Sequence, residues 1–234
     1  MNGRDPVLVL LKTVPYFADL DAAVLKTIAG RCRSKMLPAG QPVFMEGDSC
    51  LDLCILESGR VKFYRVNTEG REQIFRVFDC LGDTFCIASA FGTGRHIVSA
   101  RAATATRLRL LDMETVNRLV REYPSMGLKL VRTAGEHMTH LVGLAEDLVL
   151  KTATERLAKY LHGLAVAEGG PKDGEVLLSR DRFPEEDLAS LLGTVRVNVS
   201  RSLANLIRTG ALDVDRGFIR IRDLAALGRI SVGK

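Results

Sequence analysis

Four cysteines and one histidine form the group of residues best suited to bind a metal or to undergo redox chemistry. Cys50, Cys54, Cys80 and Cys86 fall in one stretch of the chain, and His96 follows it. Five cysteines in a chain of 234 residues argue against a secreted disulfide framework, because their number is odd. We therefore expect reduced thiols, metal ligands or redox groups, with small buried hydrophobic residues as the alternative.

A second stretch is suited to DNA recognition. Residues 184–208 read PEEDLASLLGTVRVNVSRSLANLIR, which predicts a short helix, a turn at Gly193 and a second helix. Four apolar residues of the second helix have the spacing i, i+4, i+7 and i+8 and are predicted to face inward: Val199, Leu203, Leu206 and Ile207. This is the arrangement of a helix-turn-helix, whose second helix enters the major groove.

The opposite face of this second helix is predicted to read bases. It carries Arg196, Val197, Ser200 and Arg201. Either arginine could bind O6 and N7 of guanine, and Val197 could contact a thymine methyl group. The following segment, ALDVDRGFIRIRDL, predicts two short strands that form a wing. Four further arginines are expected to meet phosphates: Arg208, Arg216, Arg220 and Arg222.

The cysteines must be positioned by β-structure. From about residue 37 to residue 111, short apolar runs alternate with glycine-containing turn signals. Val61 and Phe63 on either side of Lys62 show the alternation of a half-buried strand. This pattern predicts an antiparallel sheet rolled into a barrel or sandwich.

Helices follow this β-region. Asp112 is a plausible N-cap for a helix to about Glu122, Pro124 opens a long helix, and a third helix runs over residues 152–167. Apolar residues of the long helix alternate spacings of three and four: Val131, Ala134, Met138, Leu141, Ala145 and Leu148. Such a seam could pack on the chain's own core, but its polar flanks favour a homodimer. The hinge between domains is expected at residues 147–151.

Composition narrows the class of protein. Apolar residues make up 47% of the chain and charged residues 26%, the balance of an ordinary globular protein. No apolar run is long enough to cross a bilayer, so a cytoplasmic protein without membrane contact is expected. The net charge of +5 is compatible with nucleic acid but does not require it. A β-barrel with a catalytic metal would be an enzyme, but the chain has no HExxH or CxxC motif.

Taken in order, these segments resemble the cyclic-AMP receptor protein / fumarate and nitrate reduction regulator (CRP/FNR) family of bacterial transcription factors. The resemblance is carried by AGQPVFMEGD, ILESGRVKFYRV, LGDTFCIASAF, YPSMGLKLVRT and DLASLLGTVRVNVSRSL. It implies an α+β protein with an N-terminal β-roll of the cyclic-nucleotide-binding type over residues 1–122. A dimerisation helix and hinge (123–150) and a winged helix-turn-helix (151–234) would follow.

The resemblance also implies partners and base-reading residues. A dimer would bind palindromic double-stranded DNA, and RNA polymerase would be a further partner. Arg196 and Arg201 match positions that the family uses for bases, and Ser200 matches one used in the fumarate-nitrate branch. Val197 stands where a glutamate is usual, so the half-site is expected to differ from the ordinary one. A signalling module of the cyclic-nucleotide type that does not bind DNA is the alternative.

The pocket departs from the cyclic-AMP members of the family. Their ribose-binding glutamate corresponds to Ile87, their phosphate-binding Arg-Ser pair to His96 and Ile97, and their purine-binding polar residues to Leu141 and Val142. Apolar side chains cannot replace these hydrogen bonds. Cyclic AMP is therefore not expected. The iron–sulfur centre of the oxygen-sensing branch is not expected either, because no cysteine precedes Cys32.

Three effector classes remain open. Cys86 matches a haem-thiolate ligand of the family's carbon monoxide sensor, although that sensor's second ligand, a histidine, corresponds to Ala88. Haem with Cys86 and His96 as axial ligands is one hypothesis. An apolar small molecule is another, and thiol oxidation of Cys50 with Cys54, or of Cys80 with Cys86, is the third. The expected pocket residues are Phe85, Cys86, Ile87, His96, Ile97, His137, Met138, Leu141 and Val142. In the purely structural alternative, the cysteines are core thiols and His96 is an exposed turn residue.

Overall fold

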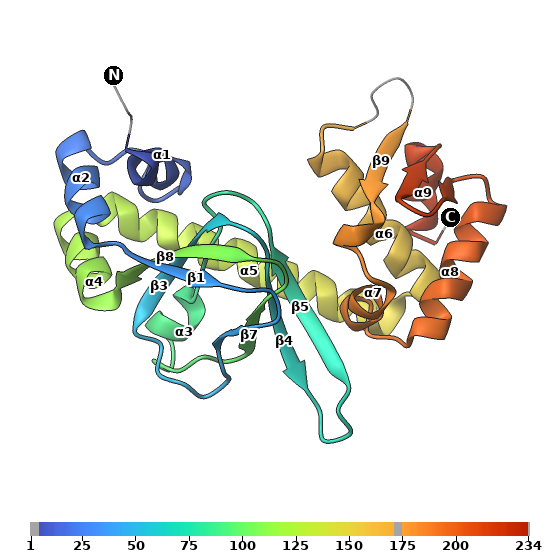
Figure 1. Ribbon diagram of the computed structural model, residues 1–234, viewed down its shortest axis with the longest axis horizontal. Helices are drawn as coiled ribbons and strands as arrows, with labels where there is room; N and C mark the ends of the chain where they lie inside the picture. Colours follow the sequence, from blue (N-terminus) through green and yellow to red (C-terminus); the bar gives the residue numbers. More distant parts are fainter. Residues whose placement is uncertain (1–4, 171–174, 234) are drawn as a thin grey trace. The chain divides into compact units, whose positions relative to one another are not determined.

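A computed structural model describes residues 5–170 and 175–233 (Figure 1). The chain divides into two units. The first contains Met1–Arg65 and Phe75–His140, and the second contains Val66–Ile74 and Leu141–Lys234. The helix α5 (Pro124–Leu150) crosses this division in the sequence. Each unit has its own hydrophobic core and is described separately below.

Two four-stranded sheets form the β-roll, which belongs to the first unit except for residues 66–74 at the β4–β5 turn (Figure 1). One has the order β1 (Arg33–Leu37), β8 (Thr106–Asp112), β3 (Asp52–Ser58) and β6 (Thr84–Phe85). The other has the order β2 (Pro42–Phe44), β7 (Ser99–Ala102), β4 (Val61–Val66) and β5 (Glu72–Phe78). The pairs β1–β8, β3–β8, β3–β6, β2–β7 and β4–β7 are antiparallel. The predicted antiparallel β-domain is confirmed.

Alternation of side chains places the core between the sheets. Along β8, Leu108 is buried while its neighbour Arg107 is exposed, because successive side chains of a strand point to opposite faces. The β3–β4 turn depends on Gly59, which has φ +94 and lies so close to Ala105 that a Cβ would stand 2.5 Å from its carbonyl oxygen. Only glycine fits this turn without strain.

The helices of the first unit precede and follow the strands of the β-roll in the sequence. They are α1 (Pro6–Thr13), α2 (Ala22–Arg31), α4 (Met113–Glu122) and the first part of α5, with the short α3 (Ile87–Phe91) inside the roll segment. Asp112 caps α4 by accepting a hydrogen bond from the Thr115 amide at 2.7 Å, and Pro124 opens α5. Both helix starts were predicted. The core under these helices includes Leu11, Phe17 and Val116.

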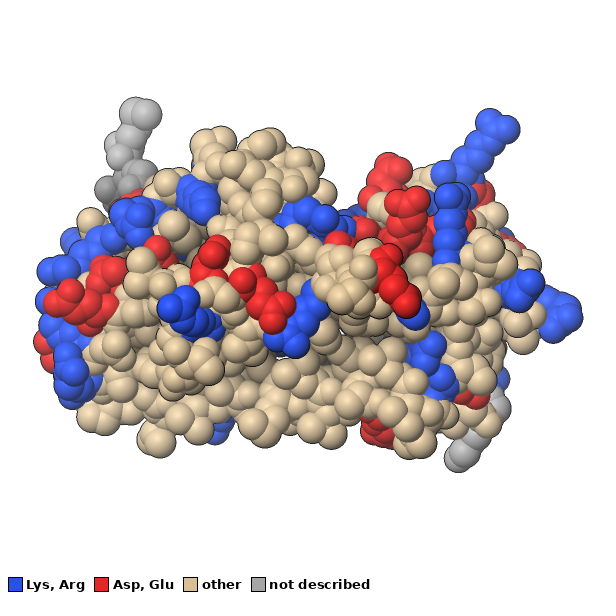
Figure 2. All heavy atoms as spheres, turned by 90° about the horizontal axis from the view of Figure 1, so that it is seen from below, with Lys and Arg blue, Asp and Glu red and all other residues tan. Residues whose placement is uncertain are grey.

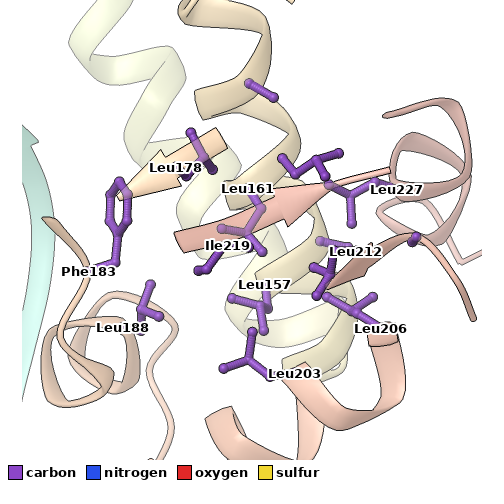
Figure 3. Packing of buried hydrophobic residues seen from close by; sticks show 14 of the residues in the cluster. Leu157, Leu161, Leu178, Phe183, Leu188, Leu203, Leu206, Leu212, Ile219 and Leu227 are labelled. Atoms are coloured by element: carbon purple, nitrogen blue, oxygen red, sulfur yellow. The ribbon is translucent and has the colours of Figure 1, made fainter. Parts of the chain in front are cut away.

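In the described part of the second unit, four helices that follow α5 pack around a three-stranded sheet. The helices are α6 (Ala153–Ala167), α7 (Glu185–Leu191), α8 (Arg196–Arg208) and α9 (Leu224–Ile230). The sheet has the order β10 (Leu212–Val214), β11 (Phe218–Ile221) and β9 (Val176–Ser179), and a 3₁₀ turn (Arg180–Arg182) follows β9. Leucines from α6, α8 and β9 meet in one core (Figure 3). The wing strands were predicted, but β9 was not.

Hydrogen bonds hold the corner between α5 and α6. The Arg156 guanidinium donates to the backbone carbonyls of Asp147, Leu148 and Lys151 at 3.0–3.4 Å. The Asp147 carboxylate accepts from Lys159 at 2.6 Å and lies 3.0 Å from the Lys151 ammonium group. Burial alone would raise the pKa of Asp147, but the two lysines outweigh it and hold that pKa below its ordinary value. The segment predicted as a hinge therefore forms a firmly bonded turn.

Candidate functional site: a reading helix and a thiol cluster

The helix-turn-helix is built from α7 and α8. Its turn needs Gly193, which has φ +60, a conformation that other residues rarely adopt. Val199 and Leu206 are fully buried and hold α8 on the core. Ile207, predicted to face inward, is 41% exposed. Eight residues of helix place it about 80° away from Val199, at the edge of the apolar stripe rather than in it.

All four residues of the predicted base-reading face of α8 are exposed: Arg196, Val197, Ser200 and Arg201. Glu185 of α7, which the sequence analysis missed, orients two of them. It accepts from Arg196 Nε at 3.3 Å and from Ser200 Oγ at 3.0 Å. The Arg201 guanidinium makes no hydrogen bond or ion pair with any residue that the structure describes. Of the two arginines on this face, Arg201 is therefore the more available to a ligand.

The four predicted phosphate-contacting arginines differ in availability. Arg220 and Arg222 are both paired with Glu175, and Arg222 also donates to Asp213 at 2.8 Å. The Arg208 side chain donates to Asn205 Oδ1 at 3.2 Å within its own helix. Arg216 stands exposed at the turn between the wing strands. On the face drawn in Figure 2, basic and acidic groups alternate, so that no single-sign field covers it.

Aromatic rings fill the interior of the β-roll. Phe85 lies between Phe63 and Phe78, with ring centroids 5.4 and 5.1 Å away. Phe44 is stacked on His96, 3.5 Å between centroids and 5° between planes. His96 is only 7% exposed, so its expected place as an exposed turn residue was wrong. The ring that stacks on His96 and buries it belongs to Phe44 of β2, which is distant in the sequence.

The remaining predicted pocket residues divide into two groups. Phe85, Cys86 and Ile87 are buried with His96, and His137 is half-buried, 6.4 Å from the Phe78 centroid. Burial, with the nearby positive charge of Arg76, lowers the pKa of His137. The others have substantially exposed side chains: Ile97, Met138, Leu141 and Val142. Of the predicted set, the structure thus brings Cys86 and His96 together.

A cluster of thiols lies beside His96. Donor atoms of Cys50, Cys86 and His96 all lie within 4.8 Å of one another, and Cys54 Sγ is 3.9 Å from Cys86 Sγ. Cys54 meets Cys86 because β3 pairs with β6, with Cys54 opposite Phe85 in the register. The pairs Cys50 with Cys54 and Cys80 with Cys86 stay predictions. Cys80 is exposed, outside this cluster.

The backbone explains how these residues meet. Residues 47–50 and 94–96 pair as antiparallel neighbours: the Cys50 amide donates to Gly94 O at 2.9 Å, and the His96 amide donates to Asp48 O at 2.9 Å. Cys86 has φ +86, the one positive φ of a non-glycine residue in the described chain. Such a backbone costs about 1 kcal/mol or more.

Titration behaviour differs among the clustered groups. The hydrogen bond with Cys86 lowers the pKa of Cys50 to about 5, with help from His96 and against the effect of burial. Burial, and then the same hydrogen bond, raises the pKa of Cys86 well above its ordinary value. Burial likewise raises the pKa of Tyr16, which lies near Cys86 and Cys54. The cluster therefore favours one thiolate, on Cys50.

Comparisons with known proteins match both halves of the chain. The cyclic nucleotide-binding domain family matches residues 34–123, and the Crp-like helix-turn-helix domain family matches residues 155–230. The described residues contain no helix that is long and apolar enough to cross a membrane.

Relatives of known function are transcription regulators. A CRP-like cAMP-activated global transcriptional regulator of Mycobacterium tuberculosis (strain CDC 1551 / Oshkosh) is 25% identical over 220 residues, covering 94% of this chain and 97% of the relative. The fumarate and nitrate reduction regulatory protein of Escherichia coli (strain K12) is 28% identical over 205 residues, covering 85% and 78%.

Solved structures share the fold. A CooA mutant from Carboxydothermus hydrogenoformans has a TM-score of 0.77 at 24% identity, covering 95% of each chain. FixK2 from Bradyrhizobium japonicum has a TM-score of 0.72 at 22% identity, covering 85% of this chain and 96% of that one. With both domains matched in the same order as in these relatives, the chain belongs to the CRP/FNR family of DNA-binding transcription regulators.

Proposed function

We propose that this regulator works as a homodimer that binds palindromic DNA through α8 and the wing, under the control of an effector bound in the β-roll. Residues 1–122 would hold the effector, 123–150 would dimerise, and 151–234 would bind DNA. The observation that carries this proposal is the exposed face of α8, where Arg201 is unpaired within the described chain. RNA polymerase would be a further partner.

Exposed apolar side chains on α5 support the dimer. Val131 is 70% exposed, Met138 68% and Leu141 48%. Ala145 is exposed as well, while Leu148 is half-buried and Ala134 packs against the core of the first unit. Exposed apolar residues at helical spacing match a seam between two copies of one helix.

Two arginine contacts and one apolar contact would read the DNA. Arg201 would bind a guanine edge, Arg196 would do so from its position against Glu185, and Val197 would contact a thymine methyl. Ser200 would contribute a hydroxyl. Among the phosphate candidates, Arg216 is the most available, because Arg220 and Arg222 would first have to leave their acidic partners.

The effector is proposed to be neither cyclic AMP nor haem. Ile87 is buried where a ribose-binding carboxylate would be needed. An iron between Cys86 and His96 would place the Cys50 sulfur inside the area of the porphyrin ring, because all three donor atoms lie within 4.8 Å. Phe44, stacked on His96, and the ring cluster around Phe85 also occupy the space of a macrocycle. An apolar small molecule would have to displace the same rings.

Selection from a random double-stranded DNA library tests the function. We expect an inverted repeat, bound by a dimer in analytical ultracentrifugation, with an affinity that falls steeply as salt rises. Arg201→Ala should weaken binding by about 1–3 kcal/mol and relax specificity at one base pair. Arg118→Ala on α4 removes the same charge far from α8 in sequence and should leave specificity unchanged. Recovery of no sequence, or an affinity independent of salt, would contradict the proposal.

A further inference from the structure

Three side chains inside the β-roll have the donor chemistry of a metal centre. Cys50, Cys86 and His96 are 6%, 5% and 7% exposed. Their donor atoms lie within 4.8 Å of one another. Two thiolates and one imidazole suit a borderline-soft divalent cation such as Zn²⁺, and three protein ligands leave a fourth position open.

Distances in the cluster are close to those that a tetrahedral ion requires. Bonds of about 2.3 Å from zinc to sulfur place two sulfur ligands about 3.8 Å apart. Cys54 Sγ and Cys86 Sγ are 3.9 Å apart, so this interior already holds sulfur atoms at the spacing of a shared ion. The donor atoms of Cys50, Cys86 and His96 lie within 4.8 Å of one another, and binding of an ion would draw them closer together.

An unpaired polar atom gives a second, independent indication. Nδ1 of His96 is buried and has no hydrogen-bond partner among the described residues. An orphaned buried donor or acceptor is costly to the fold. Coordination of an ion by Nδ1, beside two thiols, would satisfy this atom.

We propose that Cys50, Cys86 and His96 bind one divalent cation of the Zn²⁺ type, and that this ion is the effector of the β-roll. The ion joins two thiolates and one neutral imidazole, and any proton that a ligand thiol still carries leaves to solvent. No electron is transferred. The assignment as effector rests on the proposed function, but the metal site itself does not.

The three proposed ligands lie on separate backbone segments, so a bound ion could change the conformation of the β-roll. Cys50 and His96 lie on two paired segments, whereas Cys86 lies between β6 and α3. A shared ion would tie these separate segments together. The state with metal and the state without would therefore differ in the packing of α3, which gives the differential affinity that an effector needs.

Cobalt titration of the reduced, chelator-treated full chain tests the site. We expect one Co²⁺ per chain, thiolate-to-cobalt charge-transfer absorption, tetrahedral visible bands and displacement by Zn²⁺. Cys50→Ser and His96→Gln should lose the charge-transfer bands or weaken Co²⁺ binding at least tenfold. Circular dichroism of each metal-free variant establishes that it is folded.

Cys80→Ser is the matched control, because it makes the same chemical change at an exposed cysteine. Cys80 also belongs to the other candidate group, with Asp79 and Asp83. Retention of all bands in Cys80→Ser supports the buried site. Their loss in Cys80→Ser, their survival in folded Cys50→Ser, or absence of charge-transfer absorption from the wild type would overturn it.

DNA binding separates failure of this inference from failure of the proposed function. With the selected DNA duplex, Zn²⁺ should change the affinity of the wild type at least fivefold and that of Cys50→Ser by less than twofold. Equal affinity with and without bound Zn²⁺ would overturn the assignment as effector. An affinity that responds to oxidant instead, with two thiols lost on thiol titration, would overturn it in favour of a disulfide. No DNA binding in any state would contradict the proposed function alone.

Discussion

The reading helix and the interior of the β-roll carry their candidate functions in opposite ways. On α8, the side chains proposed to meet DNA are exposed, and buried Val199 and Leu206 only hold them in place. In the roll, the side chains proposed to meet the effector are themselves part of the core. A surface residue can change its ligand without affecting the fold, whereas a change at Cys86 or His96 also changes the packing.

The largest expected effect comes from breaking the aromatic interior. Phe85→Ala should lower the free energy of unfolding by about 3–5 kcal/mol, because Phe85 is 1% exposed among other phenylalanine rings. Phe91→Ala is the control, since Phe91 is 49% exposed. Urea unfolding followed by circular dichroism measures both. Similar losses for the two variants would contradict the distinction between interior and surface.

Two valines on α8 allow a buried and an exposed position to be compared within one helix. Val199 is fully buried and Val197 is 59% exposed. Val199→Ala should cost about 2 kcal/mol of stability, while Val197→Ala should change stability by less than about 0.5 kcal/mol and alter base preference at one position. Thermal unfolding and competition binding with single-base operator variants measure the pair. An unchanged base preference in Val197→Ala would remove this residue from the reading face.

A pH-dependent effect should arise at Asp147. Its lowered native pKa means that the ionised carboxylate stabilises the fold above the unfolded pKa of about 4, and that this stability is lost as pH falls through the native value. Asp147→Asn should therefore cost about 1 kcal/mol near pH 7 and progressively less below pH 4. The exposed neighbour Glu146 provides the control variant Glu146→Gln. Urea midpoints from pH 2.5 to pH 7 give the profile, and a constant difference across this range would contradict the mechanism.

A small net effect is expected at Cys86. Cys86→Gly removes a buried thiol but also removes the strain of φ +86, so the two contributions should leave stability within about 1 kcal/mol of the wild type. Cys54→Gly, in the middle of β3, loses burial without relief of strain and should be clearly less stable. Guanidinium unfolding of the metal-free proteins compares them. An equal loss at both positions would mean that the Cys86 backbone is not strained.

Local signals in the sequence were sufficient for the helix starts and for the reading helix. Asp112, Pro124 and Gly193 act through their own backbone or through residues within one turn, so their effects can be predicted without the fold. The thiol cluster could not be predicted in this way. The contact of Cys54 with Cys86 depends on the β3–β6 register, and the burial of His96 depends on Phe44, a residue on a distant strand. The sequence alone therefore does not show which thiols meet Cys86.

The corner between α5 and α6 determines what kind of motion can pass through it. One guanidinium, that of Arg156, holds three carbonyl groups at the end of α5, so the last turn cannot unwind without losing all three bonds together. If that turn rotates with its hydrogen bonds intact, α6 must rotate with it. The three bonds thus couple the orientation of α6 to that of the last turn of α5.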